Sequence, residues 1–454
     1  MALSPTEIDL IEKLKRNLDA TATDDERLLR YFQGRQRLEQ LGMAIPPAMR
    51  RFLVISNWGR VVVGTKADRQ QVRSLFLPGE ETADPTLRDI WDGSNLDAHV
   101  QMFNRDRMIY GRAFLSVGSN ETDPATPLVR VESPREMTAL VDVRREVVTA
   151  AARFYGVDEV TQAGPTNVTL YLPNVTVWVE KRRGRWYEVD RDEHNLGAVP
   201  VIMHLNRRMS SGWVGESELT DIIPLMDAAA RSLTNLQFAQ EAHGIPRMWM
   251  TGVARGDFVD AAGKPIPQFE AYFDAIHMLT SKEAKVGQLT AADLKNFETA
   301  LNIYGQQASI VTGFPARYFG STTIQPPTEG SVVADESKLI RSVEADNVEV
   351  GKTLGWAGAL ALRFSTGEWV QGNRVRVEWH NPATPTIAQR TDAVVKMRQS
   401  GLISREGAWD EFGWSEARKA KERAYFEAEA SDPALERITA SLMGAADAGT
   451  DSGL

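Results

Sequence analysis

Apolar residues recur at steps of three and four along several segments, a spacing that places them on one face of a helix. The first such segment starts at Ser4-Pro5-Thr6-Glu7, which matches a capping box with proline in the first turn. It predicts a helix that continues to about Leu18. A second helix is expected over 24–41, where Gly42 and two later prolines stop the pattern.

Three longer stretches of the same pattern occupy the second half of the chain, over 217–242, 290–312 and 331–364. In the first of them, Pro224 either kinks the helix or marks its true start. Glycines and prolines interrupt the residues between the first two helices. We therefore interpret 244–288 as a small insertion of strands and turns at the tip of an antiparallel helix pair.

Short runs rich in β-branched residues alternate with turn signals in the region up to about Asn206. Strands are expected over 61–63, 113–117, 128–131, 168–172, 175–179 and 199–205. Helices are expected over 66–75, 86–91 and 96–110. The mixture predicts an α+β fold built around antiparallel strands.

The pattern changes again after the third long helix. A strand pair is expected over 368–371 and 374–379, followed by three shorter helices over 387–400, 404–412 and 415–430. The last residues, 431–454, contain few large apolar side chains, so we expect them to be disordered.

Composition narrows the class of protein. The chain has 454 residues, which is long for one core, and its hydrophobic and charged contents of 43% and 25% are those of a soluble globular protein. No cysteine is present, which excludes disulfides and thiolate metal sites. No run approaches the ~20 apolar residues of a membrane helix, and we expect neither a signal peptide nor a membrane partner.

The formal net charge of −9 bears on nucleic acid as a partner. Proteins that grip nucleic acid usually present a basic face, because neutralising phosphates supplies much of their affinity. Either DNA is not a partner of this chain, or the protein touches DNA without holding it.

Motifs of catalysis and metal binding are missing from the sequence. There is no phosphate-binding Gly-x-x-x-x-Gly-Lys-Ser/Thr loop, and Glu241 and His243 lie two residues apart, on different faces of a helix. We expect no enzyme activity, no cofactor and no metal, with a hydrolase of unrecognised site as a minor alternative. Lys181-Arg182-Arg183 is interpreted as the solvated end of a hairpin.

Several short stretches occur in an order typical of one protein family. They are Tyr31-Phe32-Gln33-Gly34 with Gln36-Arg37-Leu38, Asn57-Trp58, Tyr110-Gly111-Arg112-Ala113, Glu132-Ser133-Pro134, Val199-Pro200-Val201, Asn206-Arg207, 217–235, Thr312-Gly313-Phe314-Pro315 and Gly401-Leu402-Ile403-Ser404. Through them the chain, over about 31–425, resembles the portal proteins of tailed double-stranded DNA phages, in the branch found in long-tailed phages of Gram-positive hosts. None of these stretches is a catalytic signature.

The resemblance implies a portal fold with an α/β wing, a two-helix stem, a small α/β clip, a long wing helix and a short helical crown. By position, the wing is 1–215 and 331–384, the stem helices are 216–243 and 290–317, the clip is 244–289, the tunnel loop is 318–330, and the crown is 385–430.

The resemblance also implies a function. Portal subunits form a ring, here expected to be a dodecamer, at one capsid vertex of the virion, after assembly in the host cytoplasm. Double-stranded DNA passes through the ring without specific binding. The large terminase subunit, the scaffold and major capsid proteins, and a head–tail connector are the expected protein partners. The alternative is another minor head or adaptor protein of a phage.

Two sets of residues are candidate sites under this resemblance. The central part of the tunnel loop carries no charge and is expected to face DNA with Ser321, Thr322, Thr323, Ile324 and Gln325. Charged residues along the first stem helix are expected to contact neighbouring subunits, namely Glu218, Asp221, Asp227, Arg231 and Glu241.

Overall fold

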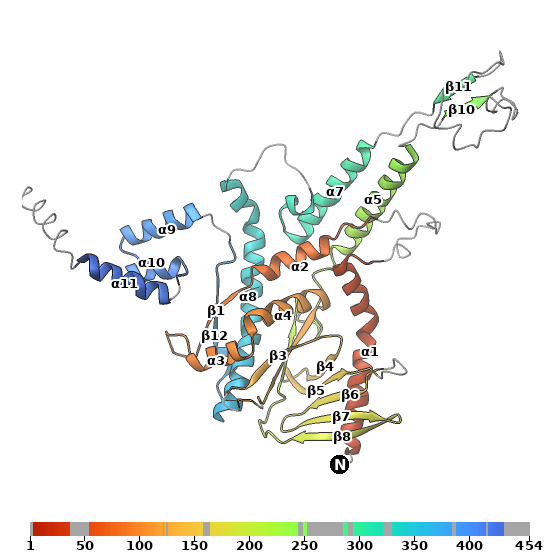
Figure 1. The fold of residues 1–454 in the computed structure, drawn as a ribbon. Helices are drawn as coiled ribbons and strands as arrows, with labels where there is room; N and C mark the ends of the chain where they lie inside the picture. Colours follow the sequence, from red (N-terminus) through yellow and green to blue (C-terminus); the bar gives the residue numbers. More distant parts are fainter. Residues whose placement is uncertain are drawn as a thin grey trace, which may run out of the picture. The chain divides into compact units, whose positions relative to one another are not determined.

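A computed structural model describes residues 3–36, 54–120, 122–123, 126–157, 164–243, 248–251, 285–288, 294–320, 329–383, 387–414 and 416–430. The chain divides into two compact units, Met1–Pro382 and Ala383–Leu454. Helices and antiparallel sheets alternate along the first unit, and the second is helical where it is described (Figure 1). The expected α+β class is confirmed.

The first helix, α1 (Pro5–Gln33), is one continuous element, although the sequence pattern predicted two. The capping box is confirmed, since the Glu7 N–H donates to the Ser4 hydroxyl and the Ser4 N–H donates to the Glu7 carboxylate. No glycine or proline interrupts the residues between the two expected helices. The helix therefore continues until Gly34, whose left-handed backbone ends it.

The next elements correct two predictions. Residues 61–63 were expected as a strand but belong to α2 (Trp58–Asp68), which the Asn57 side chain caps. Residues 66–75 were expected as a helix, but their second half belongs to β1 (Val72–Phe76). Both errors arise because tertiary packing overrides local propensity: one face of α2 is buried, and β1 pairs with a strand about 300 residues later. The helices α3 (Pro85–Gly93) and α4 (Leu96–Tyr110) match their predicted positions.

A five-stranded antiparallel sheet has the order β4-β5-β6-β7-β8. Its strands are β4 (Met137–Asp142), β5 (Val147–Tyr155), β6 (Asn167–Tyr171), β7 (Thr176–Arg182) and β8 (Arg185–Asp192). Of these, β4, β5 and β8 were not predicted. Helix α1 packs on one face of this sheet, where Ile11, Leu14 and Leu170 are buried together (Figure 1). Part of the other face packs against the three-stranded sheet described next, where Phe114 and Ala151 are buried together, and the rest borders the groove described below.

The described part of the first unit has three smaller sheets. One has the order β3-β2-β9, from β2 (Arg112–Gly118), β3 (Leu128–Glu132) and β9 (Val201–Leu205). Another joins β1 to β12 (Arg376–Trp379). The strand pair predicted over 368–379 is therefore wrong: its second strand pairs with β1, and a short 3-10 turn, η5 (Gly372–Arg374), precedes it.

Three long helices follow the sheets: α5 (Ile223–His243), α7 (Lys295–Thr312) and α8 (Glu329–Thr366). Pro224 occupies the first turn of α5. Of the two interpretations that the sequence allowed, the structure therefore supports the one in which Pro224 marks the start of the helix. Helices α5 and α7 lie side by side, with α5 running toward the strands β10 (Met248–Thr251) and β11 (Lys285–Gln288) and α7 running back from them (Figure 1). These two strands pair antiparallel.

A helical core holds the long helices against α1 and α2. It contains Trp58, Met226, Phe319 and Val343, from α2, α5, the 3-10 turn η4 (Ala316–Phe319) and α8. The rings of Trp58 and Phe319 meet edge to face with centroids 5.6 Å apart. Since these residues lie up to 285 positions apart, this core fixes the base of the long helices only once the whole first unit has folded.

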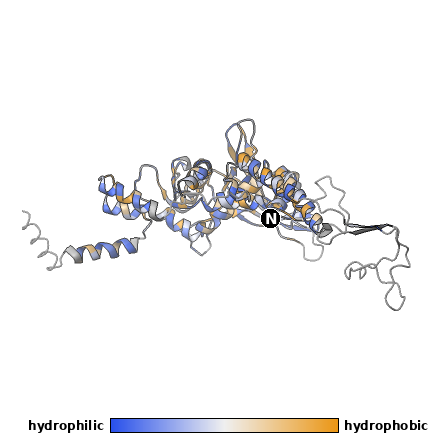
Figure 2. Cartoon of the chain, turned by 90° about the horizontal axis from the view of Figure 1, so that it is seen from above, coloured by the Kyte–Doolittle hydropathy of each residue, from blue (hydrophilic) through white to orange (hydrophobic). Residues whose placement is uncertain are grey.

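The second unit contains α9 (Ile387–Gln399), α10 (Arg405–Glu411) and α11 (Glu416–Ala430), at the positions predicted. Hydrophilic residues cover most of α11 (Figure 2). The Trp409 ring stacks on Trp414 and Phe426, which gives this small unit an aromatic core. In the described parts of both units, no helix has the length and apolar character needed to cross a membrane. Residues 431–454 lie outside the described residues.

Candidate functional site

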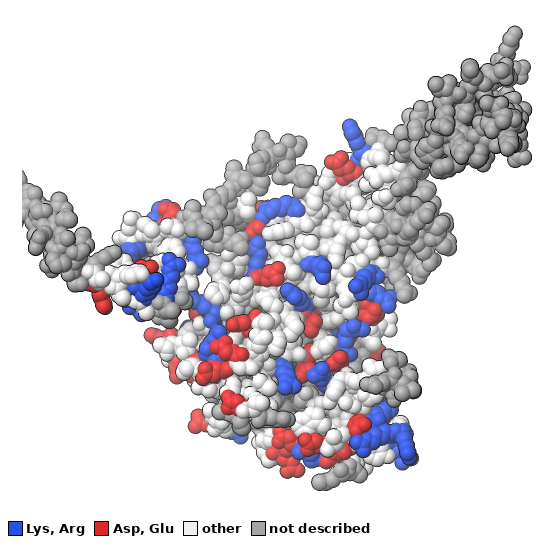
Figure 3. Space-filling model, viewed as in Figure 1, with Lys and Arg blue, Asp and Glu red and all other residues white. Residues whose placement is uncertain are grey.

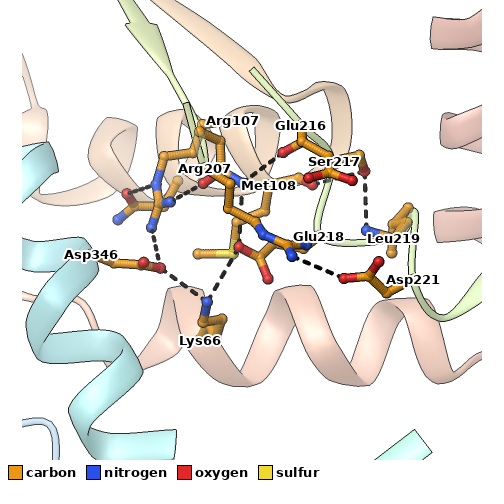
Figure 4. A network of polar contacts seen from close by, with 12 residues as sticks. Lys66, Arg107, Met108, Arg207, Glu216, Ser217, Glu218, Leu219, Asp221 and Asp346 are labelled. Carbon is orange, nitrogen blue, oxygen red and sulfur yellow. Dashed lines mark hydrogen bonds and ion pairs between the residues drawn. The ribbon is translucent and has the colours of Figure 1, made fainter. Parts of the chain in front are cut away.

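A network of buried polar residues lies where the chain passes from the sheets into α5. It joins α2, α4 and α8 to the segment that precedes α5 (Figure 4). Buried charges are costly unless they are paired and hydrogen-bonded, so a cluster of them marks a place where position matters.

Arg107 of α4 is at the centre of this network, with 2% of its side chain exposed. Its guanidinium donates to Asn206 Oδ1 at 2.5 Å and to Gln70 Oε1 at 2.6 Å. It also forms an ion pair with Asp346 of α8 at 3.3 Å. One side chain thereby connects α4 to the end of β9, to the turn after α2 and to α8.

Lys66 of α2 provides the second connection. Its ammonium lies 3.3 Å from a Glu218 carboxylate oxygen and 3.1 Å from Asp346, and 5% of the side chain is exposed. Asp346 thus forms ion pairs with both Lys66 and Arg107. Because Lys66 and Arg107 are buried and their carboxylate partners are partly buried, the base of α5 cannot shift relative to α8 without leaving a charge unpaired.

Backbone contacts hold the segment before α5 onto the end of α4. The Glu218 N–H and the Ser217 hydroxyl both donate to the Met108 carbonyl, at 2.8 and 3.1 Å. The side chain of Asn206 donates to the Glu216 carbonyl at 2.9 Å. A Cβ atom at Gly215 would lie only 1.8 Å from the carbonyl oxygen of Gly111. The two chain segments therefore lie so close together that only glycine fits at position 215.

A buried histidine borders the network. His204 of β9 has its Nδ1 2.8 Å from the Thr353 hydroxyl of α8. Burial, and then the positive charge of Arg107, lower the pKa of His204 to about 3. The imidazole is therefore neutral near pH 7 and contributes a hydrogen bond, not a charge.

The expected stem-contact residues have different surroundings. Glu218 is mostly buried and bound to Lys66, whereas Asp221 is exposed and pairs with Arg207 at 2.9 Å. Asp227 accepts a hydrogen bond from the Tyr31 hydroxyl at 2.9 Å, and burial is the main cause that raises its pKa. Arg231 is exposed on α5. Glu241 belongs to α5, but its side chain lies outside the described residues.

The five predicted DNA-facing residues, 321–325, lie outside the described residues. The structure does describe both ends of the segment that contains them. Gly320 ends η4 in a left-handed conformation, and α8 begins at Glu329. Arg317 and Tyr318 both contact Glu336 of α8, so η4 is fixed to the first turns of the helix that follows it.

Sequence reasoning missed most of the network. It singled out Glu218 as a surface contact and did not identify Lys66, Arg107 or Asp346. One sequence feature could have revealed these residues. Arg107 is a charged residue next to the apolar run Met108-Ile109-Tyr110, at a position where the helix pattern predicts a buried side chain. The stretches Tyr110-Gly111, Asn206-Arg207 and Ser217, noted in the sequence for their order, meet at this joint.

No chemistry of bond cleavage is apparent in this arrangement. Within the described residues, no group of three or more His, Asp or Glu side chains is placed to hold a metal ion. The network pairs its charges with one another. What it supplies is a rigid connection between the long helices and the sheets.

Comparison with known proteins identifies the family. Residues 11–434 match the family model described as "Phage portal protein, SPP1 Gp6-like". The portal protein of Mycobacterium phage D29 is 32% identical over 416 residues, which cover 88% of this chain and 84% of that protein. The portal protein of Mycobacterium phage L5 is 31% identical over 414 residues, with the same shares covered.

Solved structures give a weaker likeness. A chain from the virion of a native gene transfer agent particle matches 85% of this chain with a TM-score of 0.47 and 13% identity. A chain from the neck of the native particle, computed with C12 symmetry, matches 86% with a TM-score of 0.46 and 12% identity. The family match and the two mycobacteriophage relatives decide the family, and they favour a portal protein over another minor head or adaptor protein. This chain belongs to the phage portal protein family of the SPP1 Gp6-like type.

Proposed function

We propose that this portal-family chain assembles into a closed ring, a dodecamer, at one vertex of a phage capsid, and that double-stranded DNA enters and leaves the capsid through the ring. Family membership supports the proposal. Its role is structural, not enzymatic. Within this function, the large terminase subunit, the scaffold and major capsid proteins and a head–tail connector are its partners, and assembly precedes packaging in the host cytoplasm.

One observation on the subunit carries the ring proposal. Helix α7 exposes Ile303, Ile310 and Val311, of which Ile303 and Ile310 are 50% and 64% exposed. Seven residues are close to two turns of a helix, so both isoleucines lie on the same face. Large apolar side chains that repeat on one exposed helix face favour an interface with another copy. The exposed charges Asp221 and Arg231 of the α5 side fit the polar rim of such a contact.

The family anatomy is proposed by position. Residues 1–215 and 331–384 are the wing, 216–243 and 290–317 the stem, 244–289 the clip, 318–330 the tunnel loop, and 385–430 the crown. The side-by-side helices α5 and α7 and the β10–β11 pair between them in sequence support the stem and clip. The acidic balance of the chain supports a bore along which DNA slides, because a basic wall would bind the phosphates.

Imaging by negative stain tests the ring. The purified protein should appear as rings with a central hole, and Ile303→Asp with Ile310→Asp should leave unassembled subunits. Burying one such side chain contributes about 1.5–3 kcal/mol, so losing two per interface is enough to prevent closure. Val143→Asp, at a 64% exposed position of the β4–β5 turn, is the matched control and should form rings. Absence of rings in the unaltered protein under all conditions would refute the proposal.

A further inference from the structure

The face of the five-stranded sheet opposite α1 borders a groove that the portal anatomy leaves unexplained. Part of this face packs against β2 and β9, and the rest lines a cavity of about 680 Å³ together with residues of β2 and β3. Trp178 and Tyr155 line it with aromatic rings, the guanidinium of the subunit's own Arg153 lies 5.2 Å from the centre of the Tyr155 ring, and Asp190 and Asp192 lie at the end of β8. Aromatic faces beside carboxylates are the surroundings that a guanidinium group prefers.

The groove is lined by four carboxylates and by two guanidinium groups, those of Arg153 and Arg130, so its negative charge is only partly balanced. Its Arg153 already pairs with Glu132 at 3.0 Å, and its Glu180 pairs with Arg182 at 2.7 Å. For Asp190 and Asp192, no ion-pair partner is found among the residues that the structure describes. His194 also lines the groove, and burial lowers its pKa, so it supplies no compensating charge near pH 7. Its Nε2 is buried without a hydrogen-bond partner in the described structure.

The same sheet carries the opposite charge at its other end. The β7–β8 hairpin turns at Arg183 and Gly184, both with positive φ, and exposes Arg182, Arg183 and Arg185. Figure 3 shows Lys and Arg side chains gathered at this tip and Asp and Glu side chains toward the far end of β8. Within the described residues, Arg183 and Arg185 form no ion pair.

Arg183 and Arg185 of the tip cannot reach Asp190 and Asp192 in the groove of their own subunit. Arg185 and Asp192 are the first and last residues of β8. At ~3.3 Å per residue, seven steps along a strand separate them by about 23 Å, far beyond the 4 Å of an ion pair. A second copy of the chain, which presents both patches, is the partner whose charge matches each of them.

We propose that the arginine-rich tip of the β7–β8 hairpin of one subunit binds the acidic aromatic groove of the next subunit. The contact joins two different patches of identical chains, which is the kind of contact that closes a ring by rotation. Arg183 and Arg185 pair with Asp190 and Asp192, and a guanidinium plane lies against the Trp178 ring of the groove. This inference rests on the proposed ring function.

Charge reversal tests the contact. Arg183→Glu with Arg185→Glu should raise the subunit concentration for half-maximal ring formation by roughly tenfold, and Asp190→Arg with Asp192→Arg should do the same. The chain that carries all four substitutions should assemble like the unaltered protein, because both patches are then reversed. Ring formation is measured by sedimentation velocity at several salt concentrations. Arg144→Glu with Arg145→Glu, at the exposed β4–β5 turn, is the control of equal charge change.

The outcomes separate this inference from the proposed function. If the unaltered protein forms no rings, the proposed function fails first. If it forms rings and the two reversed pairs assemble normally, the tip binds something else and the inference is overturned. Loss of only a species of twice the ring mass would show that the tip joins two rings back to back, which also overturns it. Thermal unfolding of each variant must match the unaltered protein, and rescue by the fourfold variant excludes misfolding as the cause.

Discussion

Replacing Lys66 by methionine is the sharpest perturbation of the joint beneath α5. Methionine keeps much of the aliphatic length and removes the charge that lies between Glu218 and Asp346. Removing one member of a buried ion pair costs about 3–5 kcal/mol. The lower end is expected here, because Asp346 keeps its contact with Arg107, and Glu218 keeps the amide of Asn206 at 3.3 Å.

The expected change in melting temperature follows from that cost. Unfolding entropy is about 2.1 cal/mol/K per residue, so a cooperative unit of roughly 300 residues has about 0.6 kcal/mol/K. A loss of about 3 kcal/mol then lowers Tm by about 5 °C. Scanning calorimetry at matched subunit concentration measures this shift. The matched control is Lys352→Met on α8, whose side chain is 60% exposed and should change Tm by less than about 1 °C.

A double variant separates charge pairing from packing. Lys66→Met combined with Glu218→Gln removes both charges, so it should recover part of the loss, with a coupling of about 1–3 kcal/mol. Hydrogen exchange at the start of α5 should rise in the single variant and return toward normal in the double one. A single variant that melts within 1 °C of the unaltered protein, or a double variant whose effects simply add, would show that the network does not hold the base of α5.

Three further predictions concern a glycine, a buried carboxyl group and the proposed tunnel loop. Gly215→Ala should lower stability by at least about 3 kcal/mol, because its Cβ would lie 1.8 Å from the Gly111 carbonyl oxygen, whereas Gly64→Ala, with open space around it, should be neutral or stabilising in thermal melts. Burial raises the pKa of Asp106 to about 7, above the ~3.9 of an unfolded chain. The folded state therefore binds more protons than the unfolded chain, and the free energy of unfolding falls as pH rises from about 4 to 7. In denaturant unfolding, Asp106→Asn should raise the free energy of unfolding by roughly 1–2 kcal/mol at pH 8 and change it little at pH 4. Asp68→Asn, at an exposed carboxyl group, is the control. Thr323→Lys with Gln325→Lys in the proposed tunnel loop should slow DNA packaging at low salt and less so at high salt, and normal packaging by intact rings would end the proposed DNA contact.

The sequence by itself determined the elements whose signals are local. The capping box at Ser4, the boundaries of α4 and the three terminal helices were all predicted, because caps and apolar periodicity act within a few residues. The sequence left open whether Pro224 kinks α5 or starts it, and the structure shows that it starts it. The order of short stretches also identified the portal family, which the family match over 11–434 confirms. The sequence also shows which catalytic motifs it lacks. It does not show which charged side chains pair with one another in the fold.

Only the tertiary structure decided the features that depend on distant residues. Val61-Val62-Val63 is helical because one face of α2 is buried in the helical core, and β12 pairs with β1, about 300 residues away, not with its neighbour in sequence. Glu218 has the same sequence signature as an exposed helix charge, yet Lys66 of α2 and the side-chain amide of Asn206 both contact its carboxylate. The sequence indicated a basic hairpin end at 181–183, but only the structure placed Asp190 and Asp192 in the lining of a groove at the far end of β8. In each case the deciding energy comes from contacts between residues far apart in the chain, which no local pattern contains.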